Sequence, residues 1–378
     1  MSDAGIMSGM LAGHATSEGA SRYVQRFAGR IPAEHFRELP GGVRVSTIGL
    51  GTYLGREDDA TDALYQKAIG RVLERGVNLL DTAVNYRHQR SERIIGAALA
   101  AAVGRGELSR EEVVIATKGG FIPFDAEVPA DPGAYFQATY VRSGIIQPGD
   151  VVGSHCITPR YLRDQLDRSR ANLGLETVDV YYVHNPETQL DELSRPEFLK
   201  RIREAFAALE AAIGEGKLRL YGAATWNGFR ADPGEPGYLS LPELFEVARE
   251  VGGPDHHFRV VQLPYNLAMP EAFTRANQKV DGVFVSTLEA ARRLGVYVMA
   301  SASVYQGQLT RGLPPVVTDY LPGLSTDAQR AIQFVRSTPG IGTALVGMKT
   351  LAHVEDNMAA AAVAPMAWEQ FKRLFSEA

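Results

Sequence analysis

Short apolar segments recur along the chain and alternate with longer, amphipathic ones. The apolar segments are rich in Val, Ile and Leu, and they occupy residues 47–51, 77–81, 113–118, 178–184, 218–223, 258–263, 296–300 and 343–347. Continuous apolar strands that alternate with helices are typical of a parallel sheet covered on both faces. Eight such units predict an α/β fold, a (β/α)8 TIM barrel, although an open doubly wound sheet shows the same local pattern.

The segments between these strands have the periodicity of helices that bury one face. In the clearest of them Pro196 marks the start, Ile202 and Phe206 lie on one apolar stripe, and Gly214 marks the end. Further helices are predicted at 159–173, 325–336 and 351–361, and one outside the barrel at 366–376.

The N-terminus and two long connections complete the predicted architecture. The first ~20 residues are rich in Gly, Ser and Ala without a period, which predicts a mobile tail. We therefore assign residues 1–34 to an N-terminal tail and residues 35–378 to a single barrel domain that begins with a β-hairpin. Connections 119–157 and 301–323 follow strands, so we expect extended loops on the C-terminal face of the barrel, as lids or substrate walls.

Composition excludes several classes of protein. With 39 Lys and Arg against 44 Asp and Glu, the chain of 378 residues has a formal charge of −5, so it has no basic field to hold a nucleic acid. Its one cysteine, Cys156, cannot form an internal disulfide. The chain starts without the pattern of a secretory signal, and no apolar run reaches the ~20 residues of a membrane span. We expect a cytoplasmic protein without nucleic-acid or membrane partners, and no heptad pattern indicates its oligomeric state.

Polar side chains stand at or just beyond the ends of neighbouring predicted strands. Asp81 ends the second strand and is followed in the next loop by Tyr86, while Lys118 ends the third strand and His184 the fourth. A carboxylate keeps a nearby lysine charged, and the ammonium lowers the pKa of a neighbouring phenol from its usual ~10. Such a phenol is a good proton donor, and a histidine can hold an oxygen that gains charge. This set favours addition of hydride to a carbonyl carbon, and the hydride must come from a cofactor.

Each of these residues has a simpler interpretation when it is taken alone. Asp81 would be a helix cap and Lys118 a surface charge, while Tyr86 would be a loop residue and His184 a hydrogen-bonded core histidine. Their joint occurrence favours catalysis. Two other functions stay open: a Schiff-base lyase that uses Lys118, and a cofactor-binding regulatory or assembly subunit with little turnover. Asp81 argues against the lyase because it raises the pKa of the lysine. No metal site is predicted.

Three segments in this order resemble motifs of the aldo-keto reductase family. Segment 80–86 (LDTAVNY) resembles the signature around that family's catalytic Asp and Tyr. Segment 116–118 (ATK) resembles the surroundings of its lysine, and segment 178–184 (VDVYYVH) resembles the strand with its histidine. The resemblance runs from about residue 36 to about residue 361. It implies a bacterial NADPH-dependent reductase of small aldehydes or ketones in which Tyr86 is the general acid.

The resemblance also implies where a nicotinamide cofactor binds. The residues implied to contact it are Gly51, Thr52, Thr225, Gln262, Gly347, Met348, Lys349, Thr350, His353, Asp356 and Asn357. Gly51 and Thr52 would lie on the nicotinamide side, Gln262 at the carboxamide, and the segment that starts at Gly347 at the adenosine. Lys349 at a helix N-terminus, together with His353, suits the 2′-phosphate of NADP, so NADP is expected and NAD less so.

Two positions depart from the family pattern. The family usually has Ser-Asn at the carboxamide, where this chain has Ala224 and Thr225. Many members have a tyrosine that stacks on the nicotinamide, where this chain has Ser301. These departures bear on nicotinamide binding and leave the four candidate catalytic residues in place. We expect Tyr53, Asn185 and Trp226 to wall the substrate pocket.

Overall fold

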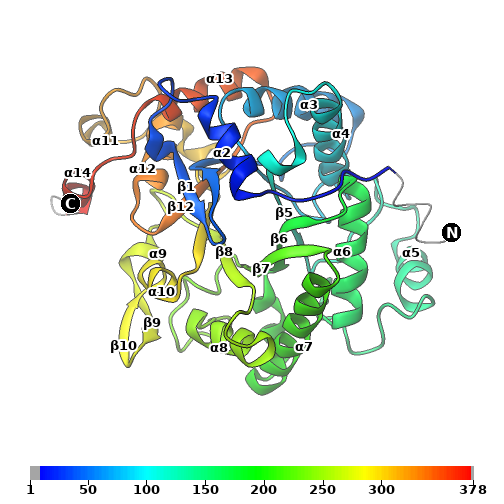
Figure 1. Cartoon of the computed structure of the whole chain (residues 1–378). Coiled ribbons are helices and arrows are strands. Elements are labelled where there is room, and N and C mark those ends of the chain that lie inside the picture. The colour runs from blue at the N-terminus through cyan, green and yellow to red at the C-terminus, as the bar shows by residue number, and fades with distance from the viewer. Residues whose placement is uncertain (1–8, 376–378) are drawn as a thin grey trace.

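Eight parallel strands close into a barrel that is surrounded by helices (Figure 1). The computed structural model describes residues 9–375 of the chain. The barrel strands are β3 (Ile48–Gly51), β4 (Leu79–Asp81), β5 (Val114–Gly119), β6 (Val178–His184), β7 (Leu218–Ala224), β8 (Phe258–Pro264), β11 (Tyr297–Ser301) and β12 (Ile341–Gly347). They follow one another around the barrel in chain order, and β12 pairs with β3 to close the circle. All eight predicted strands are confirmed, and closure excludes the open doubly wound sheet.

The outer helices bury one apolar stripe each against the strands. The long ones are α3 (Asp59–Glu74), α4 (Arg90–Gly104), α6 (Pro159–Leu173), α7 (Arg195–Gly214), α8 (Leu241–Gly252), α10 (Thr287–Leu294), α12 (Asp327–Ser337) and α13 (Leu351–Ala359). Helix α7 begins as its sequence predicts, because Ser194 and Glu197 form a capping box that satisfies free amides of the first turn. Its Ile202 and Phe206 are buried in the core between helices and strands.

Side chains fill the inside of the barrel. Leu79, Val180, Tyr182 and Met299 belong to one inner cluster, in which the Tyr182 hydroxyl donates to the Met299 sulfur at 3.1 Å. The barrel is therefore a packed core and no pore, so a ligand must bind at one of its ends.

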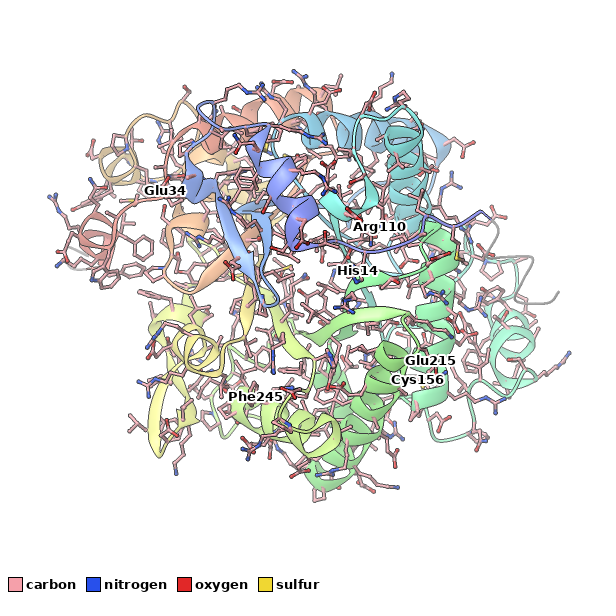
Figure 2. The ribbon with its side chains drawn as sticks, in the orientation of Figure 1. His14, Glu34, Arg110, Cys156, Glu215 and Phe245 are labelled. Atoms are coloured by element: carbon pink, nitrogen blue, oxygen red, sulfur yellow. The ribbon has the colours of Figure 1, made fainter. Side chains whose placement is uncertain are left out.

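The segment that precedes the first hairpin packs across the end of the barrel where the strands begin. The Ala15 amide donates to Asp179 Oδ1 at 2.7 Å, and Asp179 is paired with buried Arg110 at 2.7 Å. Figure 2 shows His14 and Arg110 at this end of the barrel. Helix α2 (Ser17–Gln25) then lies against the barrel.

The expectation of an N-terminal tail over residues 1–34 is wrong for the described part, residues 9–34. The physical reason is apolar burial, since α2 inserts Tyr23 under the barrel and its hydroxyl donates to the carbonyls of Leu73 and Val77. Residues 1–8 lie outside the described residues.

The remaining elements are short. The predicted hairpin is present as β1 (Phe36–Leu39) and β2 (Val43–Ser46), and a second hairpin that the sequence did not predict is formed by β9 (Ala276–Val280) and β10 (Val283–Ser286). The long connections contain α5 (Pro132–Phe136), the π-helical turn η3 (Gln137–Val141), η5 (Tyr305–Thr310) and α11 (Pro315–Tyr320). The outer helix expected at 366–376 is found as α14 (Trp368–Phe371) and η7 (Lys372–Phe375), and residue 376 lies outside the described residues. The other short helices are η1 (Ala33–His35), η2 (Arg110–Glu112), η4 (Pro186–Asp191), α9 (Glu271–Thr274) and η6 (Ala360–Ala362).

Among residues 9–375, no helix combines the length and the apolar character that crossing a bilayer requires.

Candidate active site

A cavity of about 850 Å³ opens where the barrel strands end. The predicted site residues that line it are Gly51, Thr52, Tyr53, Asp81, Tyr86, His184, Asn185, Thr225, Trp226, Gln262, Gly347, Lys349, His353, Asp356 and Asn357. The register of the barrel brings these strand ends together, since Gly51 pairs with Asp81 and Ala224 with Gln262. The structure thus gathers at one cavity residues that are far apart in the sequence.

Lys118 does not line the cavity but supports it from below through a buried ion pair. Its Nζ lies 2.6 Å from Asp81 Oδ1 and donates to the Thr82 carbonyl at 2.7 Å. Gln262 Nε2 donates to the other oxygen of Asp81 at 2.7 Å. Burial raises the pKa of Asp81 and lowers the pKa of Lys118, and the attraction between the two opposes both shifts.

Tyr86 lies over this pair in a way that the sequence did not predict. Lys118 Nζ is 4.9 Å from the centroid of the Tyr86 ring, on its face. Burial, followed by the negative charge of Asp81, raises the pKa of Tyr86 well above its usual value. The expectation that this pKa lies below its usual value is therefore wrong for this structure, because desolvation of the phenolate dominates the net shift. The side chain is a protonated phenol at neutral pH and can donate its proton.

His184, the fourth candidate catalytic residue, lines the cavity beside Tyr86. Its ring centroid is 5.9 Å from that of Tyr86 and 5.1 Å from that of Phe121, both edge to face. Burial, and secondly the positive charge of Lys118, lowers the pKa of His184 well below its usual value. The imidazole is therefore neutral, with one nitrogen that donates and one that accepts.

A chain of hydrogen bonds that the sequence did not reveal fixes the backbone at His184. His155 Nε2 lies 2.6 Å from the His184 carbonyl, so this nitrogen carries the proton and donates. Gln189 Nε2 donates to His155 Nδ1 at 2.9 Å, and Arg201 donates to Gln189 Oε1 at 2.6 Å. His155 lies within the long connection 119–157, and its partners come from residues distant in sequence, so no local motif could have found it. Within residues 9–375 neither His155 nor any other residue belongs to a cluster suited to a metal ion.

We expect His35 and His155 to stay neutral through the physiological pH range. Burial lowers the pKa of His35 to about 3 and that of His155 to about 4. Unfolded histidine takes up a proton near pH ~6.5, so each group costs the fold about 1.4 kcal/mol per pH unit below that value, until its own folded pKa is reached. Titration of the histidine ring signals by NMR checks this. A midpoint above pH ~6 for either ring would contradict the burial argument.

The far end of the cavity lies at the start of α13. Lys349, His353, Asp356 and Asn357 line it. Asp356 accepts hydrogen bonds from Gln329 Nε2 at 2.8 Å and from the Thr326 hydroxyl, so its carboxylate is already engaged. Among the described residues, Lys349 is the lysine that lines this end of the cavity, so it can offer a positive charge to a ligand there.

Two residues expected at the cofactor do not line the cavity. Met348 is fully buried and packs in the core between helices and strands. The Thr350 hydroxyl caps α13 by accepting from the His353 amide at 3.2 Å. The side chains of both residues are thus engaged away from the cavity, and a contact of their backbone with a cofactor stays a prediction.

The positions that depart from the family pattern, Ala224, Thr225 and Ser301, line the cavity. Thr225 Oγ1 is buried at the cavity and has no hydrogen-bond partner among residues 9–375, so it has a free polar group to offer. Residues 301–304, 306, 307 and 310 of the connection that was expected to be a lid or substrate wall also line the cavity. Ala302 (φ 52°), Tyr305 (φ 46°) and Gln306 (φ 52°) are left-handed there, a strain of about 1–3 kcal/mol each that is typical of functional loops.

The residues expected to wall a substrate pocket, Tyr53, Asn185 and Trp226, line the cavity. Tyr53 is 57% exposed and its ring lies 5.0 Å from that of Tyr86, while Trp226 is 39% exposed. Half-buried Glu187 accepts hydrogen bonds from the backbone amides of Trp226 (2.7 Å) and Asn227 (3.1 Å) and thereby fixes the Trp226 loop. Burial raises the pKa of Glu187, and these amides oppose the shift.

At the C-terminal face of a (β/α)8 barrel, this chain thus brings together a phenol, a neutral imidazole and a buried lysine–carboxylate pair, which are groups that can donate and accept protons. A sequence profile described as "Aldo/keto reductase family" matches residues 47–230. The "NADH-specific methylglyoxal reductase" of Escherichia coli (strain K12) is 31% identical over 297 residues, which span 76% of this chain and 72% of that protein. The chain belongs to the aldo/keto reductase family, whose members are oxidoreductases that reduce carbonyls.

Solved structures agree with this fold. The holo form of an aldo-keto reductase from Bacillus halodurans superposes with a TM-score of 0.61 at 19% identity and covers 90% of this chain and 95% of that one. An aldo/keto reductase from Klebsiella pneumoniae in complex with NADP and acetate superposes with a TM-score of 0.59 at 19% identity, with 90% and 95% covered. At this identity the likeness shows the fold alone.

Proposed function

We propose that this chain reduces a small aldehyde or ketone to an alcohol with a nicotinamide cofactor, and that Tyr86 is the general acid. The observation that supports this most is the meeting of Tyr86, His184 and the buried pair of Lys118 with Asp81 at one cavity. A bound reduced nicotinamide would supply hydride to the carbonyl carbon.

The residues of the chain would act on the carbonyl oxygen. Tyr86 holds a proton in an apolar setting and can transfer it as the oxygen gains charge. Neutral His184 can donate a hydrogen bond to the same oxygen. Lys118 over the face of the Tyr86 ring would stabilise the negative charge that the ring acquires when its proton leaves.

The cavity fits a dinucleotide cofactor on chemical grounds. Within the described part of the chain, buried Thr225 Oγ1 at the strand ends has no hydrogen-bond partner, and it could bind a carboxamide there. Lys349 at the start of α13 offers a charge for a phosphate, and the helix terminus adds to it. We propose NADPH as the preferred cofactor because of Lys349. The relative from Escherichia coli is named NADH-specific, which makes this choice the first point to test.

Replacing Lys349 by Met is expected to weaken NADPH binding about 10-fold and to leave NADH binding unchanged. The loss of one charge-assisted contact to a phosphate is worth roughly 1.4 kcal/mol or more, which corresponds to that factor. Cofactor fluorescence titration measures both dissociation constants. Lys279→Met, at an exposed position of strand β9, is the matched control. Equal losses for the two cofactors would remove the 2′-phosphate role from Lys349.

The substrate is proposed to be neutral. Tyr53, Phe121 and Trp226 form aromatic walls, and among the described residues no lysine or arginine besides Lys349 lines the cavity. A carboxylate on the substrate would therefore find no cation on the cavity wall near Tyr86, because Lys118 lies below the ring and is paired with Asp81.

The test is turnover of reduced cofactor with a panel of aldehydes and ketones. We expect neutral aldehydes with an aromatic or apolar part to be reduced, and their carboxylated analogues to be poor substrates. No turnover of any of them, with cofactor bound tightly, would favour the regulatory or assembly subunit instead. The Schiff-base lyase is disfavoured because Lys118 is tied to Asp81 and the Thr82 carbonyl and does not face the cavity.

A further inference from the structure

The backbone immediately after Tyr86 adopts an unusual conformation. Arg87 (φ 48°), His88 (φ 52°) and Gln89 (φ 71°) are left-handed in succession, and none of them is glycine. A left-handed conformation is unfavourable for residues with a side chain and persists only where the surroundings hold it. The turn that carries Tyr86 is therefore held in place by contacts of its own side chains.

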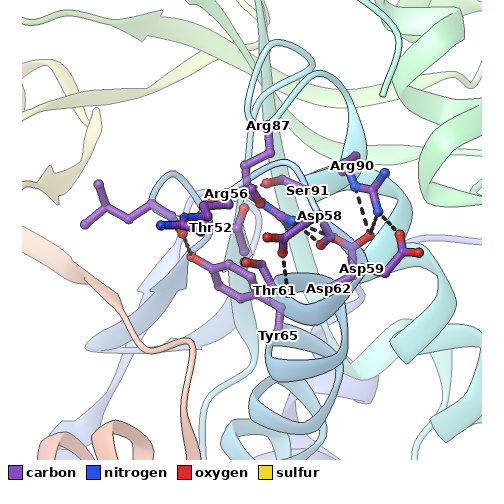
Figure 3. A network of polar contacts seen from close by, with 11 residues as sticks. Thr52, Arg56, Asp58, Asp59, Thr61, Asp62, Tyr65, Arg87, Arg90 and Ser91 are labelled. Carbon is purple, nitrogen blue, oxygen red and sulfur yellow. Dashed lines mark hydrogen bonds and ion pairs between the residues drawn. The ribbon is translucent and has the colours of Figure 1, made fainter. Parts of the chain in front are cut away.

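The Arg87 side chain makes its contacts with the loop that follows β3 and with the start of α3 (Figure 3). The residue is 4% exposed. Its Nε donates to the Arg56 carbonyl at 2.8 Å, and its Nη2 donates to the Asp58 carbonyl at 3.3 Å and to Asp62 Oδ1 at 2.6 Å. The guanidinium also lies 5.5 Å from the centroid of the Tyr65 ring.

The partners of Arg87 are themselves fixed. Asp62 accepts from Arg90 Nε at 3.0 Å, so one carboxylate joins two arginines. The Asp58 side chain caps α3 by accepting from the Thr61 amide at 2.8 Å. Figure 3 shows these side chains around the start of α3. Arg87 thus ties the Tyr86 turn to a rigid helix end.

The expected wall of the substrate pocket, formed by Tyr53 and Leu54, lies in the chain just before Arg56. Tyr53 and Leu54 line the cavity although they are 57% and 41% exposed, so little packing holds them from outside. The Tyr65 hydroxyl donates to the Leu54 carbonyl at 2.5 Å, and Arg87 packs on the same ring. Thr52, one residue earlier, is held separately, because Ser91 donates to its carbonyl at 2.9 Å.

We propose that Arg87 is a positioning residue that sets the distance between the wall of Tyr53 and Leu54 and the proton donor Tyr86. This inference rests on the proposed function of Tyr86. Arg87 touches no reacting atom; it fixes the wall that seats the substrate against the phenol. Its effect should therefore grow with the size of the substrate, because only a bulky substrate reaches the wall.

Arg87→Gly separates this role from a merely structural one. Glycine relieves the left-handed backbone, which offsets part of the hydrogen bonds and the ion pair that are lost, so we expect the variant to fold and to be less stable than the wild type in urea. It loses the tie to the wall, so kcat/KM for a bulky aromatic aldehyde should fall about 10- to 100-fold, through a higher KM and a lower kcat. The fall for acetaldehyde should be smaller, and cofactor binding should stay within about twofold because Thr52 is held independently.

His88→Gly is the matched control. It relieves the same kind of backbone strain one residue later and leaves every contact of Arg87 in place, so its kinetics should match the wild type. Arg87→Lys keeps the charge but cannot reach three acceptors at once, so its loss should lie between those of the wild type and Arg87→Gly. If Arg87→Gly fails to fold, Arg87→Lys decides the matter.

Amide hydrogen exchange of residues 53–58 measures how firmly the backbone of the wall is held, and it needs no substrate. Exchange there should be faster in Arg87→Gly than in the wild type and in His88→Gly. If exchange is unchanged, Arg87 does not hold the wall, whatever the enzyme's activity. If exchange is faster but the two aldehydes lose activity equally, the wall is held without serving substrate position, and the proposal is overturned. A wild type without turnover would instead count against the proposed function.

Discussion

Replacing Tyr86 by Phe is expected to lower kcat for carbonyl reduction about 10²- to 10⁴-fold, the usual contribution of a general acid. The substitution removes one hydroxyl and keeps the ring that lies over Lys118 and beside Tyr53. Cofactor binding and the free energy of unfolding should therefore stay near those of the wild type. Steady-state kinetics, cofactor titration and urea unfolding of the same preparation measure the three quantities.

Tyr238→Phe is a suitable control for this experiment. Its hydroxyl donates to the Asn277 carbonyl outside the cavity, so its loss should leave kcat unchanged. A Tyr86→Phe variant that keeps more than about a tenth of the wild-type kcat would show that the proton comes from elsewhere.

The pH dependence of reduction follows from the same residue. Because burial raises the pKa of Tyr86 well above its usual value, the phenol keeps its proton through neutral and mildly alkaline pH. The rate of reduction should be level there, and no loss of Tyr86's proton should appear below its ordinary pKa of ~10. An alkaline limb near neutrality that vanishes in Tyr86→Phe would instead mean that Lys118 lowers this pKa, as the sequence alone suggested.

The sequence predicted the barrel because its signal is local. Each strand is a run of Val, Ile and Leu bounded by turn residues, and a strand buried on both faces needs such a run. Asp81, Lys118 and His184 could be predicted in turn because each ends a strand, and parallel strands that end at one face bring their last side chains together. The family resemblance then added positions such as Gln262 and Lys349 on the later strands and helix.

Features that depend on contacts between distant segments could not be predicted in this way. The N-terminal segment looked polar and aperiodic, yet the Ala15 amide is bound by Asp179 on a barrel strand. The hairpin of β9 and β10 is too polar at Asn277 and Gln278 to resemble a strand. The pKa of Tyr86 was misjudged because it depends on how completely the folded chain removes water from the ring, a quantity that spacing along the sequence does not contain.

Lys118→Met is expected to produce a second large effect, on stability as well as on activity. Lys118 is fully buried and neutralises Asp81, so its removal leaves a carboxylate without a counter-ion in the core. Removing one partner of a buried pair usually costs about 3–5 kcal/mol. The pKa of Asp81, already raised by burial, should rise further, and a group with a raised folded pKa loses its stabilising effect as the pH rises through that value. The deficit in unfolding free energy should therefore be larger at pH ~8 than at pH ~5.

Lys118→Met combined with Asp81→Asn distinguishes the two roles of the pair. Asparagine can still accept the hydrogen bond from Gln262 but carries no charge, so the double variant should regain most of the lost stability and should lose the difference between the two pH values. Its kcat should stay low, because the cation over the Tyr86 ring is still absent when that ring must become negative. Urea unfolding at both pH values and steady-state kinetics test this. A double variant that regains both stability and turnover would mean that Lys118 serves only to neutralise Asp81, and that the charge on Tyr86 is stabilised without it.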